Sequence, residues 1–205
     1  DLPSLQGQEI IVRRARDIAS ITTLDGKERE LVADDLLICD RDRAVAVAGV
    51  MGGSNSEVHD QTTGTLLESA YFIPETVRRT ARRLGLRSEA SYRFERGVDP
   101  QGTILALDRA ASLLVQITEG KVSRGVIDVC PQPLPSTTIA LRGQRVSRFL
   151  GVPVEAKEVE QCIRTLGAKV RRRRGETWSV TVPSYRSDLT QEVDLIEEVT
   201  RLRGY

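Results

Sequence analysis

The sequence predicts an α+β protein in two parts, a mixed α/β domain followed by a small winged-helix-like module. Short apolar runs alternate with helical repeats over the first 130 residues. Three prolines then fall within residues 130–135, and such a stretch is stiff and cannot enter the interior of a sheet. After it the pattern becomes strand, two helices, hairpin and helix, which is close to a winged helix. We therefore predict domains over 1–130 and 137–205, joined by a linker over 131–136.

Strands are expected early in the first domain. Apolar runs at 9–13 and 36–40 flank a turn signal at 24–27, which predicts a small β-meander. Residues 44–50 have the pattern of a buried strand, which ends at a pair of glycines. Residues 65–72 predict another buried strand.

Helices are expected in the second half of this domain. Pro74 begins a helix that carries several arginines and stops at Gly85. Residues 102–119 form the clearest helix, because apolar residues recur there at helical spacing before Gly120. A short strand is predicted to follow at 126–129.

The second domain is expected to contain six elements. The patterns predict strands and helices in this order: a strand at 137–141, helices at 144–150 and 155–166, strands at 168–172 and 177–182, and an acidic helix near the C-terminus. The two later strands flank Arg174 and Gly175, which is typical of a hairpin turn.

Composition excludes several classes of protein. Hydrophobic residues make up 40% and charged residues 29%, which is typical of a soluble globular chain. Lys+Arg is 30 and Asp+Glu is 29, so the net charge indicates no particular partner. Three widely spaced cysteines predict a reducing compartment without a disulfide framework. No run predicts a membrane span or a signal peptide, and the only methionine is Met51, so we expect a piece of a longer protein.

Five stretches in order resemble one family. They are residues 48–57 (AGVMGGSNSE), 66–72 (LLESAYF), 78–86 (RRTARRLGL), 91–100 (SYRFERGVDP) and 183–188 (PSYRSD) with the acidic helix after it. Together they resemble the beta subunit of bacterial-type phenylalanyl-tRNA synthetases, over essentially the whole chain. The resemblance implies an editing domain, formed by the third and fourth modules of that subunit, followed by its fifth module.

The resemblance also implies partners and an activity. The alpha subunit of such a synthetase carries the aminoacylation site, and the beta subunit hydrolyses tyrosine wrongly attached to tRNA(Phe). The enzyme is expected to be cytoplasmic, with two alpha and two beta chains. ATP is used by the whole enzyme and is not expected to bind here.

An editing pocket for tyrosine needs a polar group in an apolar wall, because a site built to bond a hydroxyl can reject the analogue that lacks it. Glu68 meets this need, since it lies among apolar residues of the strand predicted at 65–72. The alternative is a salt bridge to an arginine of 78–83, because an unpaired buried carboxylate is costly. The resemblance places the tyrosine-recognising glutamate at Glu68.

Other pocket positions follow from the resemblance alone. It implies that Gly52 lines the pocket mouth and that Ser88 and Ala90 are small lining residues. Threonine often stands in the family where this chain has Ser88. The family site also uses a histidine and an arginine from a segment before Asp1. The only histidine, His59, is predicted to lie in a surface turn and has no assigned role.

The acidic helix near the C-terminus has two interpretations. In the first, Asp188 caps the helix together with Gln191, Glu197 pairs with Arg201, and the other carboxylates face water. In the second, the resemblance implies that Asp188, Asp194, Glu197 and Glu198 bind Mg²⁺. Magnesium suits a few carboxylates plus waters, and this site is described as shared with the alpha subunit, where the ion would serve assembly.

Two basic clusters, at 78–83 and 169–174, suggest further functions. They either keep the surface soluble or contact the phosphates of tRNA. Aromatic residues make up 4% of the chain and do not interleave with the basic runs, which argues against a base-stacking single-strand binder. Two rival functions therefore stay open: a nucleic-acid-binding module, and a structural module whose acidic helix docks on the alpha subunit.

Overall fold

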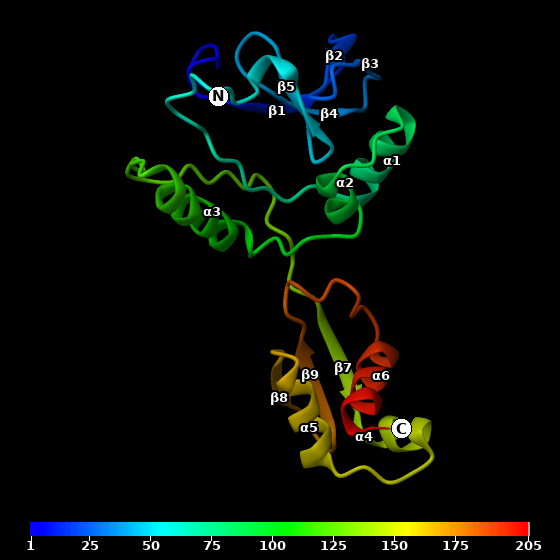
Figure 1. The fold of residues 1–205 in the computed structure, drawn as a ribbon. Helices are drawn as coiled ribbons and strands as arrows, with labels where there is room; N and C mark the ends of the chain where they lie inside the picture. Colours follow the sequence, from blue (N-terminus) through cyan, green and yellow to red (C-terminus); the bar gives the residue numbers. More distant parts are fainter. Residues whose placement is uncertain (205) are drawn as a thin grey trace. The chain divides into compact units, whose positions relative to one another are not determined.

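The computed structural model describes residues 1–204 and divides them into two compact units (Figure 1). Residues 1–98 and 102–122 form unit 1, and residues 99–101 and 123–204 form unit 2. Both units combine helices with antiparallel strands, so the predicted α+β class is confirmed. The linker predicted at 131–136 lies in an exposed stretch, residues 119–137, that contains neither helix nor strand.

A four-stranded antiparallel sheet forms the centre of unit 1. Its strands lie in the order β1-β4-β5-β6, with the bounds Ile11–Arg14 for β1, Leu36–Cys39 for β4, Ala44–Val47 for β5 and Met51–Gly52 for β6. The strands predicted near 9–13, 36–40 and 44–50 are thus confirmed. The apolar face of the sheet supplies the core, in which Leu37 and Val47 are almost completely buried.

The connection between β1 and β4 contains a separate two-stranded hairpin. It pairs β2 (Ser20–Thr22) with β3 (Glu28–Glu30) around the predicted turn at 24–27. The turn is where the sequence predicts it, but the two strands of the hairpin were not predicted. Each arm has only three residues, most of them polar, so neither shows the alternation that marks a half-buried strand.

Three α-helices and one 3₁₀ turn complete unit 1, and in Figure 1 the three helices lie on one side of the strands. The elements are η1 (Ser54–Ser56), α1 (Pro74–Leu84), α2 (Glu89–Phe94) and α3 (Thr103–Thr118). Helix α1 begins at Pro74 and ends at a left-handed Gly85, as predicted. Helix α3 confirms the second predicted helix but has no fully buried residue, and the short α2 was missed. No helix within residues 1–204 is both long enough and apolar enough to cross a membrane.

Two predicted strands are wrong. Residues 65–72 and 126–129 contain no strand, although both are rich in apolar residues. A strand needs a neighbour for its backbone hydrogen bonds, and the sheet of unit 1 ends at β1 and β6. Phe72 is nevertheless buried, whereas Ile127 is 92% exposed, so only the first segment contributes to a core.

Unit 2 has the winged-helix-like order that the sequence predicts. Its elements are β7 (Thr138–Arg142), α4 (Gly143–Leu150), α5 (Ala156–Thr165), β8 (Lys169–Arg172), β9 (Thr177–Thr181) and α6 (Glu192–Arg203). The antiparallel sheet has the order β7-β9-β8, and α5 and α6 pack against each other beside it. Trp178 of the central strand is buried against Leu141 and Leu195, which gives this unit a core of its own.

Candidate functional site

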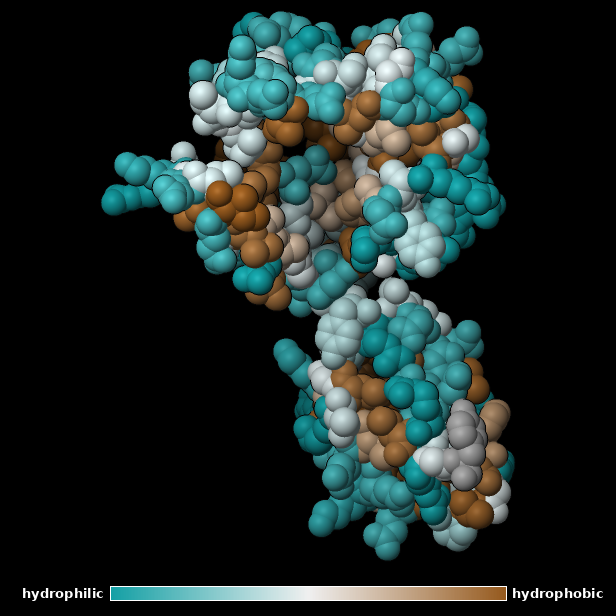
Figure 2. Space-filling view, in the orientation of Figure 1, coloured by the Kyte–Doolittle hydropathy of each residue, from teal (hydrophilic) through white to brown (hydrophobic). Residues whose placement is uncertain are grey.

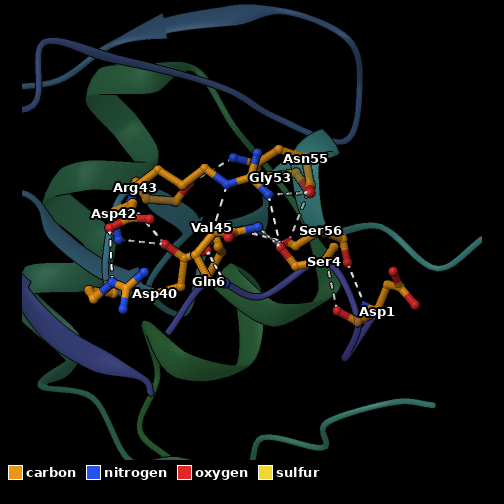
Figure 3. A network of polar contacts seen from close by, with 12 residues as sticks. Asp1, Ser4, Gln6, Asp40, Asp42, Arg43, Val45, Gly53, Asn55 and Ser56 are labelled. Atoms are coloured by element: carbon orange, nitrogen blue, oxygen red, sulfur yellow. Dashed lines mark hydrogen bonds and ion pairs between the residues drawn. The ribbon is translucent and has the colours of Figure 1, made fainter. Parts of the chain in front are cut away.

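The turn that carries Gly52 and Gly53 is held by a network of polar contacts (Figure 3). The Gly53 N–H donates to the Val45 carbonyl over 2.7 Å, and the Asn55 side-chain amide donates to the Ala44 carbonyl over 3.0 Å. Arg43 donates to the carbonyls of Asn55 and Ser4. The turn is therefore fixed to β5 on both sides, so its backbone is presented rigidly.

Asp40 anchors the same network from the turn between β4 and β5. Its carboxylate is buried and accepts hydrogen bonds from the N–H groups of Gln6, Asp42 and Arg43. Burial alone raises the pKa of Asp40, but the three backbone donors outweigh it and the net pKa is lowered. Asp40 is therefore a structural carboxylate that is fully engaged by the backbone.

The two glycines tolerate a side chain to different degrees. A Cβ on Gly53 would lie 2.9 Å from the Val45 carbonyl oxygen, which is closer than real Cβ atoms come. A Cβ on Gly52 would instead lie 3.1 Å from a methyl group of Leu24, a side chain that can shift. Packing against the backbone therefore requires glycine at position 53. At position 52 the neighbouring side chain can move, which is compatible with a place at the border of a binding surface.

Ser88 joins helix α2 to the turn before β6. Its hydroxyl donates to the Val50 carbonyl and accepts from the Ser91 N–H over 3.0 Å, while the Ser91 hydroxyl accepts from the Ser88 N–H over 3.0 Å. This reciprocal arrangement caps the helix N-terminus. Ser88 thus lies beside the chain that leads into Gly52, and Ala90 follows it, exposed, in the first turn of α2.

Glu68 lies in the irregular segment 57–73 and has no hydrogen bond or ion pair to any other residue of 1–204. The salt bridge to the arginines of 78–83, left open by the sequence, is therefore not formed within this range. The residue keeps exposed surface, yet the protein around it displaces much of the water, and this desolvation raises the pKa of Glu68. An unpaired carboxylate in such a place is available to a ligand.

The segment that carries Glu68 is fixed at its C-terminal end. Phe72 packs on Phe94 of α2 with ring centroids 5.1 Å apart, and a Cβ on Gly49 would lie 2.9 Å from Phe72. Gly49 has a φ of +69° and directly precedes Val50, so it brings the turn, α2 and the Glu68 segment together. Figure 2 shows unit 1 hollowed on the face drawn, with hydrophobic residues around the hollow.

Of the four pocket residues implied by the resemblance, three lie near one another, and the fourth, Glu68, is positioned by a different segment. The Ser88 cap brings Ser88, Ala90 and the approach to Gly52 into one neighbourhood, whereas no hydrogen bond links Glu68 to these three within residues 1–204. A hollow of about 370 Å³ adjoins η1, but its walls come from β2, the β4–β5 turn and η1 rather than from Glu68 or Ser88.

The basic face of α1 is partly structural. Arg83 pairs with the buried Asp35, which also accepts from Thr80 over 3.0 Å. Arg78 donates to the Glu95 carbonyl over 2.7 Å. Arg79 and Arg82 are exposed and remain available to an external phosphate.

Helix α6 is capped differently from the prediction. The helix begins at Glu192, too late for Asp188 to cap it, and the Asp194 carboxylate accepts from the N–H groups of Gln191 and Thr190 over 2.7 and 2.8 Å. The predicted pairing of Glu197 with Arg201 is also wrong, because Arg201 pairs with Glu198. The apolar face of α6 was predicted correctly for Leu195, Ile196 and Val199, which are buried.

Arg186 lies between two of the carboxylates proposed as metal ligands. It donates to both oxygens of Asp188, over 2.9 and 2.6 Å, and to Glu198 over 2.8 Å. The pKa of Arg186 is raised, first by Asp188 and then by Glu198, and the pKa values of both carboxylates are lowered. A bidentate guanidinium–carboxylate pair of this kind is among the stronger side-chain interactions.

The four acidic residues do not fit a cation by themselves. Asp188 and Glu198 are bound to arginine, Asp194 caps the helix, and only Glu197 is exposed without a hydrogen-bonding partner within residues 1–204. Over the same range, no three His, Cys, Asp or Glu side chains are grouped so that they could hold a metal ion. A magnesium ion shared with another subunit stays a prediction that depends on ligands from elsewhere.

The hairpin of β8 and β9 presents a dense positive surface, defined here as the wing cations. These are five exposed side chains: Lys169, Arg171, Arg172, Arg173 and Arg174. Strand β8 is an edge strand in which Lys169, Arg171 and Arg172 are exposed, and Arg173 and Arg174 follow in the connection to β9. Within residues 1–204 none of the five forms an ion pair, although Arg173 donates to Ser179 over 3.3 Å.

Comparison with known proteins identifies the two units. A model of the B3/4 domain matches residues 1–119, which is more than half of the chain. The chain belongs to the B3/4 domain family. A model of the tRNA synthetase B5 domain matches residues 139–205.

Three relatives of this B3/4 chain bear the same name. The phenylalanine–tRNA ligase beta subunits of Anaeromyxobacter dehalogenans and Geobacter metallireducens are 50% and 48% identical to it over 205 residues. The subunit of Moorella thermoacetica is 50% identical over 206 aligned residues. Each alignment covers all of this chain but only 25–26% of the relative, so the chain spans about a quarter of their length. The predicted resemblance to such beta subunits is confirmed.

Two supporting residues were not among the predicted site residues. Gly49 was not singled out, although a glycine between a buried strand and Val50 signals a left-handed turn. Arg186 was also passed over, although it lies two residues before Asp188, because its second partner is twelve residues away on α6. Local spacing could have indicated the first contact but not the second.

Proposed function

We propose that this chain recognises the tyrosine side chain of Tyr-tRNA(Phe) and forms the editing part of a synthetase beta chain that acts with an alpha subunit. The observation that carries the proposal is Glu68, a carboxylate in a B3/4 domain whose pKa is raised by desolvation and which has no hydrogen bond or ion pair to another residue of 1–204. The side chain keeps exposed surface, so a ligand can reach the carboxylate.

The chemistry of recognition follows from the carboxylate. The phenolic hydroxyl of tyrosine donates a hydrogen bond to Glu68, and phenylalanine has no group to donate. A site that loses such a bond leaves its own polar group unpaired, which discriminates by roughly 10⁴–10⁵ at most. The expected selectivity is therefore for tyrosine over phenylalanine.

Hydrolysis would use water rather than an enzyme nucleophile. A water molecule adds to the ester carbonyl, and the ribose oxygen of the tRNA leaves with a proton. Ser88 is a poor candidate for the attacking group, because its hydroxyl already donates to the Val50 carbonyl and accepts from Ser91. The protein contribution would lie in orientation and in preorganised polar groups.

Calorimetric titration of free tyrosine and free phenylalanine into the 205-residue chain tests the proposal. We expect tyrosine to bind more tightly, and Glu68→Ala to abolish the preference. Glu57→Ala is the matched control, because Glu57 is an exposed glutamate at the start of the same segment. Equal binding of the two amino acids, or a preference that survives Glu68→Ala, would count against the assignment.

The wing cations support a second candidate, contact with nucleic-acid phosphates by unit 2. Exposed cations that form no ion pair within residues 1–204, on an edge strand and in the turn after it, are a suitable surface for a polyanion. This surface would also suit the tRNA that a synthetase binds, so the two candidates are compatible. Docking of α6 on an alpha subunit remains the third, purely structural, alternative.

Salt dependence distinguishes this second candidate. If the wing contacts phosphates, the double variant Arg171→Gln/Arg172→Gln should weaken binding of tRNA and reduce the salt slope by roughly 2. Arg164→Gln provides a control, because Arg164 is engaged by Glu160. An unchanged slope in the double variant would limit the wing to a role in solubility.

A further inference from the structure

The acidic cluster of unit 2, defined here as Asp188, Glu198 and the arginines that bind them, is balanced in charge. Two carboxylates meet two guanidinium groups, those of Arg186 and Arg201. Glu198 is buried with only 8% of its surface exposed, so its charge needs compensation. The two arginines thus neutralise the carboxylate charges that a metal ion would otherwise neutralise.

Arg186 occupies the position that a bridging cation would take. One of its terminal nitrogens lies 2.6 Å from Asp188 and 2.8 Å from Glu198, so a single positive group bridges two carboxylates. The side chain is only 20% exposed, and the Arg186 carbonyl accepts from the Leu189 N–H over 3.3 Å, which ties this backbone to the approach to α6. A magnesium ion would need the same oxygen atoms at about 2.1 Å, which the guanidinium excludes.

We propose that the guanidinium of Arg186 is the resident cation of this cluster, so that unit 2 holds α6 in place without a divalent metal and binds one there only if Arg186 is displaced. Arg186 is therefore a positioning residue for Asp188 and Glu198. The inference is independent of tyrosine recognition at Glu68, which lies in unit 1.

Removal of the guanidinium should convert the cluster into a metal site. In Arg186→Gln, Asp188 and one oxygen of Glu198 lose their cation, and the remaining arrangement of two carboxylates and water is one that magnesium and manganese accept. The stability of this variant should then depend on divalent ions, whereas that of the parent chain should not.

Binding of Mn²⁺, followed by electron paramagnetic resonance on the 205-residue chain, is the direct test. We expect Arg186→Gln to bind Mn²⁺ at least roughly tenfold more tightly than the parent, and its thermal midpoint to rise with millimolar MgCl₂ and fall with EDTA. Arg164→Gln is the control, since it removes an arginine from a different carboxylate in the same unit.

Two results would overturn the proposal. One is saturable binding of a single Mn²⁺ by the parent chain that Glu198→Gln abolishes, and the other is a folded Arg186→Gln variant with no gain in Mn²⁺ affinity. If Arg186→Gln does not fold, Arg186→Lys keeps a charge but lacks the planar fork, and it should bind Mn²⁺ more tightly than the parent. Equal Mn²⁺ affinity of a folded Arg186→Lys variant and the parent would also reject the inference.

Discussion

Helix α6 of unit 2 and the segment 57–73 of unit 1 differ in whether their glutamates have ion-pair partners. On α6, Glu192 receives two arginines and Glu198 two more, so their charges serve the fold. In the irregular segment, Glu68 keeps exposed surface and has no such partner within residues 1–204, and partial desolvation by the surrounding protein raises its pKa. The difference separates carboxylates that hold a structure together from one that the structure leaves available for a ligand.

The largest effect on stability is expected at Asp35, which is a paired carboxylate in the same unit as the unpaired Glu68. It is 2% exposed and accepts from Thr80, Arg83 and the Val32 N–H. Asp35→Ala should lower the free energy of unfolding by about 3–5 kcal/mol, because it removes a buried carboxylate and leaves the buried Thr80 hydroxyl and the partly buried Arg83 guanidinium without their acceptor. Urea denaturation checks this, and a loss below about 1 kcal/mol would show that pairing does not separate the two classes.

Glu192→Ala should have the next largest effect. The Glu192 carboxylate accepts from the backbone N–H and side chain of Arg142 and from Arg145. The arginines are partly exposed, so we expect a loss of about 1–2 kcal/mol rather than the full cost of a buried pair. Glu197→Ala, on the same helix but exposed, is the control and should change stability by less than about 0.5 kcal/mol.

Glu68→Gln should act in the opposite direction. The amide removes a desolvated charge, so the free energy of unfolding at neutral pH should rise, by less than about 1 kcal/mol because water still reaches the group. The gain should vanish below pH 4.5, where the parent carboxyl is protonated in the unfolded chain as well. A clear destabilisation at pH 7 would show that Glu68 has a structural partner after all.

The smallest effect concerns the pH dependence of Glu192. Arg142 is the main cause that lowers its pKa from 4.5 to about 2. Because the folded-state pKa is the lower one, its contribution to stability is present above pH 4.5 and is lost as the pH falls toward about 2. Glu192→Gln should therefore flatten the loss of stability in this window, and an unchanged pH profile would contradict the role of the ion pair.

Local signals predicted helices well and strands less well. The start of α1 at Pro74 and the ends of α1 and α4 at Gly85 and Gly151 follow from residues with fixed backbone preferences. The strands expected at 65–72 and 126–129 fail because apolar composition alone does not provide a neighbouring strand. The cap of α6 was misplaced for a related reason, since Arg186 engages Asp188 and leaves Asp194 to cap the helix.

Local sequence patterns predicted the order of the elements in unit 2, its winged-helix-like arrangement and the residue types of the candidate site. Each of these depends on neighbours within a few positions. Only the tertiary structure decided which carboxylates are paired, because Arg186 reaches Glu198 across twelve residues and Arg83 reaches Asp35 across 48. It also left Glu68 without a partner within residues 1–204, since chain folding decides which charges approach one another.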